Sequence, residues 1–261
     1  TLKVTNGASI QAFNTGDFNL ISGGQFIVDN NGLVLANNTG DFFVKANGLA
    51  LNIPFNAATD KNFYDFRVSD GGKIQKNNSG KMSVTAKTIF LNGLDAIVGS
   101  NTSSIEFNAV PENLTNKALF PGYFKMKEAT MTNTGAFTIT GYYLNMDPSG
   151  IKSDEAVFLN ISNPDDIAFA SVLIGKGTSL FARGIGKNFI DVPTDKLIIN
   201  GDTPNAPDDN QATLTRFIPH INTNFKLDDL EKRPCNTNQN TLGTRNAKGY
   251  LPSLSYQVNY S

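Results

Sequence analysis

The chain has 261 residues, of which 39% are hydrophobic and only 17% are charged, and its net charge is −1. This length provides for one large β domain or for two domains of moderate size, each with a sizeable core. Without a basic excess the chain is not expected to bind nucleic acid, and no run of about 20 apolar residues predicts a membrane span.

Asparagine and glycine replace much of the missing charge. Asparagine accounts for about one residue in eight, and there are 23 glycines. Both residue types tolerate positive φ and end strands, so the composition predicts many turns. The single cysteine, Cys235, excludes an internal disulfide. With only one histidine, His220, a metal site built from nitrogen and sulfur ligands is not expected either.

Short apolar segments that alternate with polar residues begin at the N-terminus. Such alternation predicts half-buried strands. The segments are Leu2–Val4, Phe18–Ile21, Gln25–Val28, Leu33–Ala36, Phe42–Lys45 and Leu49–Ile53. Asn-Gly and Asp-Gly pairs, which favour tight turns, separate many of them. These turns follow one another too closely for helices to lie between the strands, which argues against an α/β fold.

One pattern recurs along the chain, with copies that begin at Asn14, Asn38, Asn78 and Asn133. In each copy, apolar residues stand four and six positions after the Asn. These pairs are Phe18 and Leu20, Phe42 and Val44, Met82 and Val84, and Phe137 and Ile139. Units of this kind bury their apolar faces by stacking on neighbours, which predicts a solenoid-like stack. The intervals of 24, 40 and 55 residues are uneven, so an antiparallel domain with similar hairpins is the alternative.

The segment Ser79–Gly93, with the sequence SGKMSVTAKTIFLNG, resembles the haemagglutinin-type repeats of secreted bacterial β-helix adhesins. The segment Phe42–Asn52 is similar to them. The resemblance covers about a fifth of the chain. It implies an exported β-helical adhesin, and it carries over no site residue.

The chain changes character near residue 110, after which the expected strands are longer. Examples are Tyr123–Thr132, Ala136–Met146 and Ala156–Ile161. We therefore predict an all-β protein of two domains. Residues 1–110 form a β-solenoid-like or β-sandwich domain, and residues 111–261 form a β-sandwich, jelly-roll-like domain with long loops.

The chain ends in a strictly alternating segment. Its apolar residues are Leu254, Tyr256, Val258 and Tyr260. This pattern predicts a terminal strand that pairs within its own sheet or serves as an assembly strand for another subunit.

No residue pattern predicts catalysis or cofactor binding. His220 lies in an apolar segment and is expected to be structural, and the chain has no G-x-S-x-G nucleophile elbow. Paired carboxylates could serve a glycosidase, but the spacing of Asp41, Asp65 and Asp70 singles out no acid and base.

Calcium remains open because it takes oxygen ligands. The candidate ligands are Asp147, Asp154, Glu155, Asp202, Asp208 and Asp209. None of them lies in an EF-hand loop or a calcium-binding nonapeptide, and a solvated turn is the simpler interpretation of each.

These observations favour an extracellular structural or adhesive protein without enzymatic activity, such as a subunit of a surface filament or pilus that assembles through β-strand contacts. The expected partners are further copies or neighbouring subunits, together with a cell-surface glycan. A phage or viral fibre or spike component and a carbohydrate-active β-helix enzyme are the alternatives. The chain begins with Thr1, which fits removal of a signal peptide and equally fits a trimmed chain.

Overall fold

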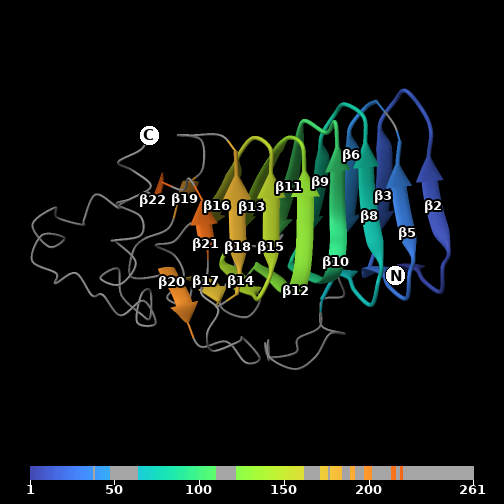
Figure 1. Cartoon of the computed structure of the whole chain (residues 1–261). Coiled ribbons are helices and arrows are strands. Elements are labelled where there is room, and N and C mark those ends of the chain that lie inside the picture. Colours follow the sequence, from blue (N-terminus) through green and yellow to red (C-terminus); the bar gives the residue numbers. More distant parts are fainter. Residues whose placement is uncertain are drawn as a thin grey trace, which may run out of the picture.

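The regular structure of this protein is built from strands. A computed structural model describes residues 1–37, 39–47, 64–109, 122–161, 171–175, 177–183, 189–191, 197–201, 213–215 and 218–219. These residues contain strands β1 to β22 and no helix, so the expected all-β class is confirmed (Figure 1). Accordingly, the described residues include no helix long and apolar enough to cross a membrane.

The strands follow one another in circuits of three positions, which we call the first, second and third rows. The first row contains β1 (Leu2–Val4), β4 (Phe26–Val28), β7 (Phe66–Val68), β14 (Tyr143–Asp147), β17 (Ser171–Gly175) and β20 (Leu197–Gly201). The second row contains β2 (Ser9–Ala12), β5 (Leu33–Ala36), β8 (Lys73–Asn77), β15 (Gly150–Ser153), β18 (Ser179–Ala182) and β21 (Thr213–Thr215). The long strands β10 (Thr88–Ser100) and β12 (Tyr123–Asn133) run through both rows and join them into one 14-stranded sheet.

The third row is an 8-stranded sheet with one strand from each circuit. It contains β3 (Phe18–Ser22), β6 (Phe42–Ala46), β9 (Met82–Ala86), β11 (Ser104–Ala109), β13 (Ala136–Gly141), β16 (Val157–Ile161), β19 (Phe189–Asp191) and β22 (Ile218–Pro219). Figure 1 shows the circuits side by side, from the blue N-terminal strands to the orange C-terminal strands.

Every described strand pair is parallel, which differs from the hairpins of a jelly-roll-like half. The described Asn-Gly and Asp-Gly turns join no antiparallel strand pair, because every pairing among the described strands is parallel. Asn31-Gly32, for example, lies between β4 and β5 and leads from the first row to the second. The strands after residue 110 continue the same sheets, since β13 pairs with β11. The expected boundary itself falls at residues 110–121, outside the described residues, and the two-domain division stays a prediction.

The register of the third row confirms the alignment of the sequence repeat. Phe18 is paired with Phe42, Phe42 with Met82, and the column continues through Ile105 to Phe137. Ile105 belongs to a circuit that the sequence comparison missed, which explains the 55-residue interval before Asn133. The interval of 40 residues contains residues 48–63, which lie between β6 and β7 and outside the described residues.

The core fills the space between the rows. In the first row, Phe26, Phe66, Ile89 and Phe124 stand above one another and are fully buried. The rings of Phe26 and Phe66 stack with their centroids 5.5 Å apart. Burying one such side chain stabilises the fold by about 1.5–3 kcal/mol. Each circuit therefore depends on its neighbours for most of its stability.

Polar side chains connect the circuits at the corner that precedes the third row. The Asp17 carboxylate accepts a hydrogen bond from the backbone N–H of Asp41. The Asp41 carboxylate in turn accepts one from the backbone N–H of Lys81, and both bonds measure 2.9 Å. The amide of Asn77 donates to that of Asn37 at 2.6 Å. This ladder gives the polar residues at the start of each repeat a structural role.

Two circuits approach closely at Gly72. A Cβ atom there would lie 2.3 Å from the carbonyl oxygen of Val28, which is backbone and cannot move aside. Gly72→Ala is therefore expected to lower the free energy of unfolding by about 1–3 kcal/mol, as overpacking does elsewhere. Urea denaturation measures the change. The matched control is Gly23→Ala, where a Cβ meets nothing within 4 Å, and an equal loss in both variants contradicts the stacked arrangement.

Candidate functional site

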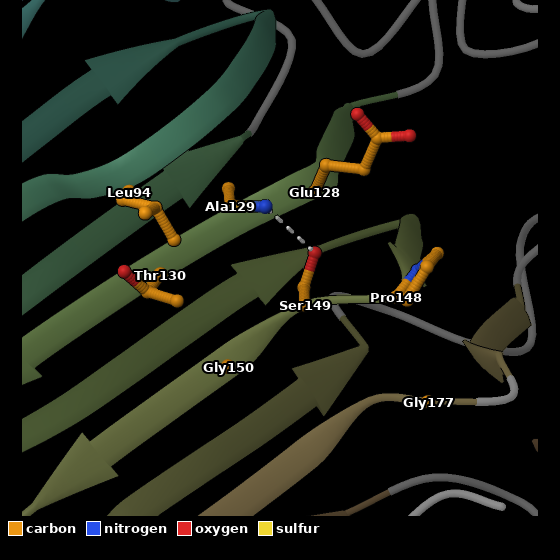
Figure 2. A pocket seen from close by; sticks show the side chains of 8 residues that line it. All are labelled: Leu94, Glu128, Ala129, Thr130, Pro148, Ser149, Gly150 and Gly177. Carbon is orange, nitrogen blue, oxygen red and sulfur yellow. Dashed lines mark hydrogen bonds between the residues drawn. The ribbon is translucent and has the colours of Figure 1, made fainter. Parts of the chain in front are cut away.

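A shallow depression lies where the first and second rows meet (Figure 2). Its volume is about 370 Å³. The lining residues come from β10, β12, the start of β15 and the turns that follow β14 and β17, and they are Leu94, Glu128, Ala129, Thr130, Pro148, Ser149, Gly150 and Gly177. We call this depression the corner groove.

Buried hydroxyl groups hold the floor of the corner groove in place. The Ser149 hydroxyl accepts a hydrogen bond from the backbone N–H of Ala129 at 3.4 Å. The Thr178 hydroxyl accepts from the N–H of Ser149 at 3.3 Å and donates to the carbonyl of Met146 at 3.1 Å. These bonds run from one circuit to the next and satisfy backbone groups that leave the ladder at this corner.

One residue that lines the corner groove, Glu128, and one that follows the lining residue Leu94, Asp95, have a costly backbone conformation. Asp95 has φ 52° and Glu128 has φ 49°, a region that non-glycine residues seldom adopt. The Thr130 hydroxyl accepts a hydrogen bond from the N–H of Asp95 at 2.7 Å. Leu94 beside them is 74% exposed. Figure 2 shows the Glu128 side chain directed away from the floor.

Most of the surface of the corner groove is apolar, with Leu94, Ala129 and Pro148 among its lining residues, and Glu128 and Thr130 add polar side chains at the rim. Glu128 is the one carboxylate among its eight lining residues. A glycosidase needs an acid and a base on two carboxyl groups. The residues that line the groove therefore do not include such a pair.

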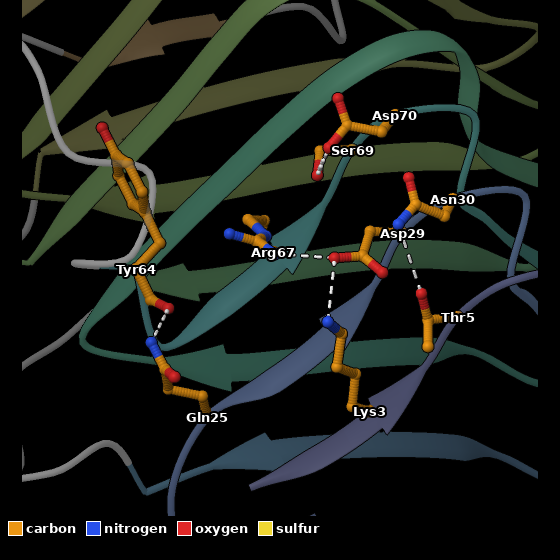
Figure 3. A network of polar contacts seen from close by, with 9 residues as sticks. All are labelled: Lys3, Thr5, Gln25, Asp29, Asn30, Tyr64, Arg67, Ser69 and Asp70. Carbon is orange, nitrogen blue, oxygen red and sulfur yellow. Dashed lines mark hydrogen bonds and ion pairs between the residues drawn. The ribbon is translucent and has the colours of Figure 1, made fainter.

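A cluster of charged side chains connects the first three circuits through ion pairs (Figure 3). The Arg67 guanidinium on β7 lies 2.7 Å from the Asp29 carboxylate, and their side chains are 7% and 5% exposed. Lys3 on β1 approaches the same carboxylate at 3.7 Å. Burial on its own would raise the pKa of the Asp29 carboxyl. Hydrogen bonds from Thr5 and Arg67 and the nearby positive charges have the larger effect, so the pKa lies below its ordinary value.

An aromatic cluster lies beside this network, on the outer side of the first row. The rings of Tyr64 and Phe90 stack at 4.8 Å, and Tyr123 lies 6.1 Å from Tyr64 and 6.0 Å from Tyr143. Next to it, burial raises the pKa of the Asp65 carboxyl to about 6, although the charge of Lys87 and hydrogen bonds from Thr88 oppose the rise. Burial also raises the pKa of the Tyr64 hydroxyl.

Among the residues that the structure describes, no group of three His, Cys, Asp or Glu side chains could hold a metal ion. The Asp154 carboxylate faces Arg183 at 4.0 Å, and the N–H of Glu155 donates to the Ser153 hydroxyl. Asp147 ends β14. The other sequence candidates lie outside the described residues, and these are Asp202, Asp208, Asp209, His220, Cys235, Leu254, Tyr256, Val258 and Tyr260.

The three carboxylates considered for glycoside hydrolysis have separate structural surroundings. Asp41 belongs to the corner ladder, Asp65 is buried, and Asp70 accepts a hydrogen bond from the Ser69 hydroxyl. Sequence reasoning missed the Arg67–Asp29 pair, whose members are 38 positions apart. It also missed the strained rim of the corner groove, for which the sequence carries no signal.

Comparison with known proteins adds no relative to this description. No protein-family model, no curated protein and no solved structure matches the chain.

The buried ion pair generates the first prediction for this region. Asp29→Asn is expected to lower the free energy of unfolding by about 3 kcal/mol or more, because it removes the carboxylate that faces a buried guanidinium. Lys3→Met is the matched control. Lys3 is 49% exposed, so its loss is expected to cost less than about 1 kcal/mol. Urea denaturation of both variants is the measurement, and equal costs contradict the assignment.

The second prediction concerns Asp65 and pH. The folded state holds a proton on this carboxyl up to about pH 6, whereas the ordinary pKa of an Asp carboxyl is 3.8. The folded state therefore binds more protons between these values, and stability falls as the pH rises through this window. Asp65→Asn is expected to remove this fall. The difference in unfolding free energy between variant and parent should then change by about 2–3 kcal/mol from pH 4 to pH 7, and a constant difference contradicts it.

Proposed function

We propose that the chain is a β-solenoid rod that serves as an extracellular structural or adhesive protein. The observation that carries the proposal is the parallel, in-register pairing of equivalent strands from circuit to circuit. Repeated circuits of this kind add length without adding a new kind of core. Such an architecture suits a structural or adhesive protein, because it forms an elongated body that exposes its lateral faces to other molecules.

The outer face of the third row supports a role in surface presentation. Ser83, Thr85, Asn108, Thr138 and Thr140 are half-buried residues that point outward from three successive strands. Glu106 stands among these short polar side chains and lies 3.5 Å from Lys81, so the face also carries an ion pair. A polar face of this kind resists nonspecific association with other proteins and tolerates an aqueous exterior.

The interior supports a structural rather than a catalytic role. In the described circuits the space between the rows is filled by side chains such as Phe107, Phe124 and Phe137, each fully buried. The corner groove is a feature of the exterior, and its rim offers Glu128 and Thr130 for contact with a polar ligand. A cell-surface glycan carries hydroxyl groups that can hydrogen-bond to these side chains. We therefore propose the corner groove as the site where such a glycan binds.

Surface labelling of intact source cells tests the proposal. Antibodies against the purified chain are expected to label unpermeabilised cells, and external protease is expected to remove the label. An antibody against an abundant cytoplasmic protein serves as the control for leakage. Labelling that requires permeabilisation contradicts an extracellular role, and co-purification with virions instead of cells favours the fibre alternative.

A further inference from the structure

Two bulges in the long strands β10 and β12 shape the corner groove. In the first bulge, Glu128 is an extra residue of β12 that has no pairing partner on β10. In the second bulge, residues 94–96 of β10 stand opposite Thr130 alone, and Asp95 is the middle one of the three. A bulge changes the direction of the side chain that it carries. Both bulges therefore turn an acidic side chain out of the regular ladder at this corner.

Glu128 is an unusual residue for its backbone conformation. Positive φ is tolerated best by glycine and, among the other residues, by Asn and Asp. The described non-glycine residues with positive φ are Asn6, Asn30, Asn31, Asp70, Asn78, Asp95, Asn101 and Glu128. All of them except Glu128 are Asn or Asp, so the fold alone does not explain a glutamate at this position. Backbone strain of this kind concentrates at binding sites.

The charge of the corner groove is negative. The Thr130 hydroxyl donates to the Asp95 carboxylate at 3.5 Å, which holds this carboxylate beside the lining. Asp95 and Glu128 are both exposed. Lys127 and Lys152 lie nearby on β12 and β15, but no lysine or arginine is among the residues that line the groove. The groove therefore complements a ligand that carries a positive charge.

The floor of the corner groove offers little to a peptide strand. The N–H of Ala129 donates to the Ser149 hydroxyl, and the N–H of Ser149 donates to the Thr178 hydroxyl. Pro148 has no N–H to donate. A peptide that adds to a sheet depends on backbone groups of this kind. The floor offers apolar surface from Ala129 and Pro148 instead, with the exposed Leu94 beside them, and such surface suits the C–H faces of sugar rings.

The corner groove follows the axis of the stack. Its lining residues belong to four successive circuits, which are those of β10, β12, β15 and β18. At about 4.8 Å for each step between circuits, the lining extends over about 14 Å. This length suits an oligosaccharide better than a single sugar.

We propose that the corner groove binds a glycan that carries free amino groups, such as a polymer of glucosamine. This inference rests on the proposed adhesive function and names the class of glycan. The ammonium groups pair with the carboxylates of Glu128 and Asp95 through charge-assisted hydrogen bonds, while a sugar ring contacts Leu94. N-acetylation removes the positive charge, so the N-acetylated form of the same polymer binds more weakly.

Isothermal titration calorimetry of the purified chain tests the proposal with two oligosaccharides of equal length, one of glucosamine and one of N-acetylglucosamine. The glucosamine oligosaccharide is expected to bind about tenfold more tightly or better, and its affinity should fall as salt is added. Equal binding of the two, or binding of neither, overturns the proposal. Oligolysine that binds as tightly as the glucosamine oligosaccharide overturns it as well, because a basic peptide is then an equal occupant.

Substitutions at Glu128 assign the binding to this groove. Glu128→Gln is expected to weaken binding of the glucosamine oligosaccharide by about tenfold or more. Glu106→Gln is the matched control and should leave the affinity unchanged, since Glu106 pairs with Lys81 on the third row. Equal effects of the two substitutions overturn the proposal.

Glu128→Asn separates binding from folding. Asn adopts positive φ more readily than Glu, so the midpoint of urea denaturation should rise while the affinity for the glucosamine oligosaccharide falls. A lower midpoint together with lost binding gives Glu128 a structural role and overturns the proposal.

Failure of this inference differs from failure of the proposed function. A chain that is labelled on intact cells but binds no amino-bearing glycan refutes the ligand and leaves the structural role standing. A chain that binds the glucosamine oligosaccharide but is labelled only in permeabilised cells supports the ligand and contradicts the extracellular role.

Discussion

Parallel hydrogen bonding between equivalent strands of successive circuits is the constraint on which the rest of the structure depends. It places each side chain directly above its counterpart one circuit away, so that like residues stack on like. Phe18 lies on Phe42 with ring centroids 5.0 Å apart, and the Asp17 and Asp41 carboxylates occupy equivalent places in the corner ladder. The same constraint sets the close approach at Gly72, where the backbone of the preceding circuit leaves no room for a Cβ.

The repeat in the sequence predicted the register of the third row because inward positions of a stacked strand must be apolar at fixed offsets. It did not predict strand direction, since Asn-Gly pairs supply the positive φ needed in a hairpin and also in a corner between two rows of strands. The circuit containing Ile105 keeps the same offsets, since Ile105 and Phe107 stand four and six positions after Asn101. It was missed because Ser103 replaces the glycine that follows the Asn by two positions in the four recognised copies. The sequence did not reveal the Arg67–Asp29 pair either. Its members meet only because the residues between them complete one circuit.

The functional features occupy distinct parts of the stack. The polar outer face of the third row and the corner groove are lateral surfaces of the stack. The Arg67–Asp29 pair and Lys3 join the first three circuits to one another.

Electron paramagnetic resonance of spin-label pairs on the outer face of the third row tests the stacked arrangement most directly. Lys45 and Thr140 are three pairing steps apart, and Lys45 and Asn160 are four steps apart. At about 4.8 Å for each step, the backbone separations are expected to be about 14 Å and about 19 Å. Labels at cysteines introduced there, with Cys235 replaced by serine, should show this constant increment. Separations that do not grow with the number of steps contradict the parallel stack.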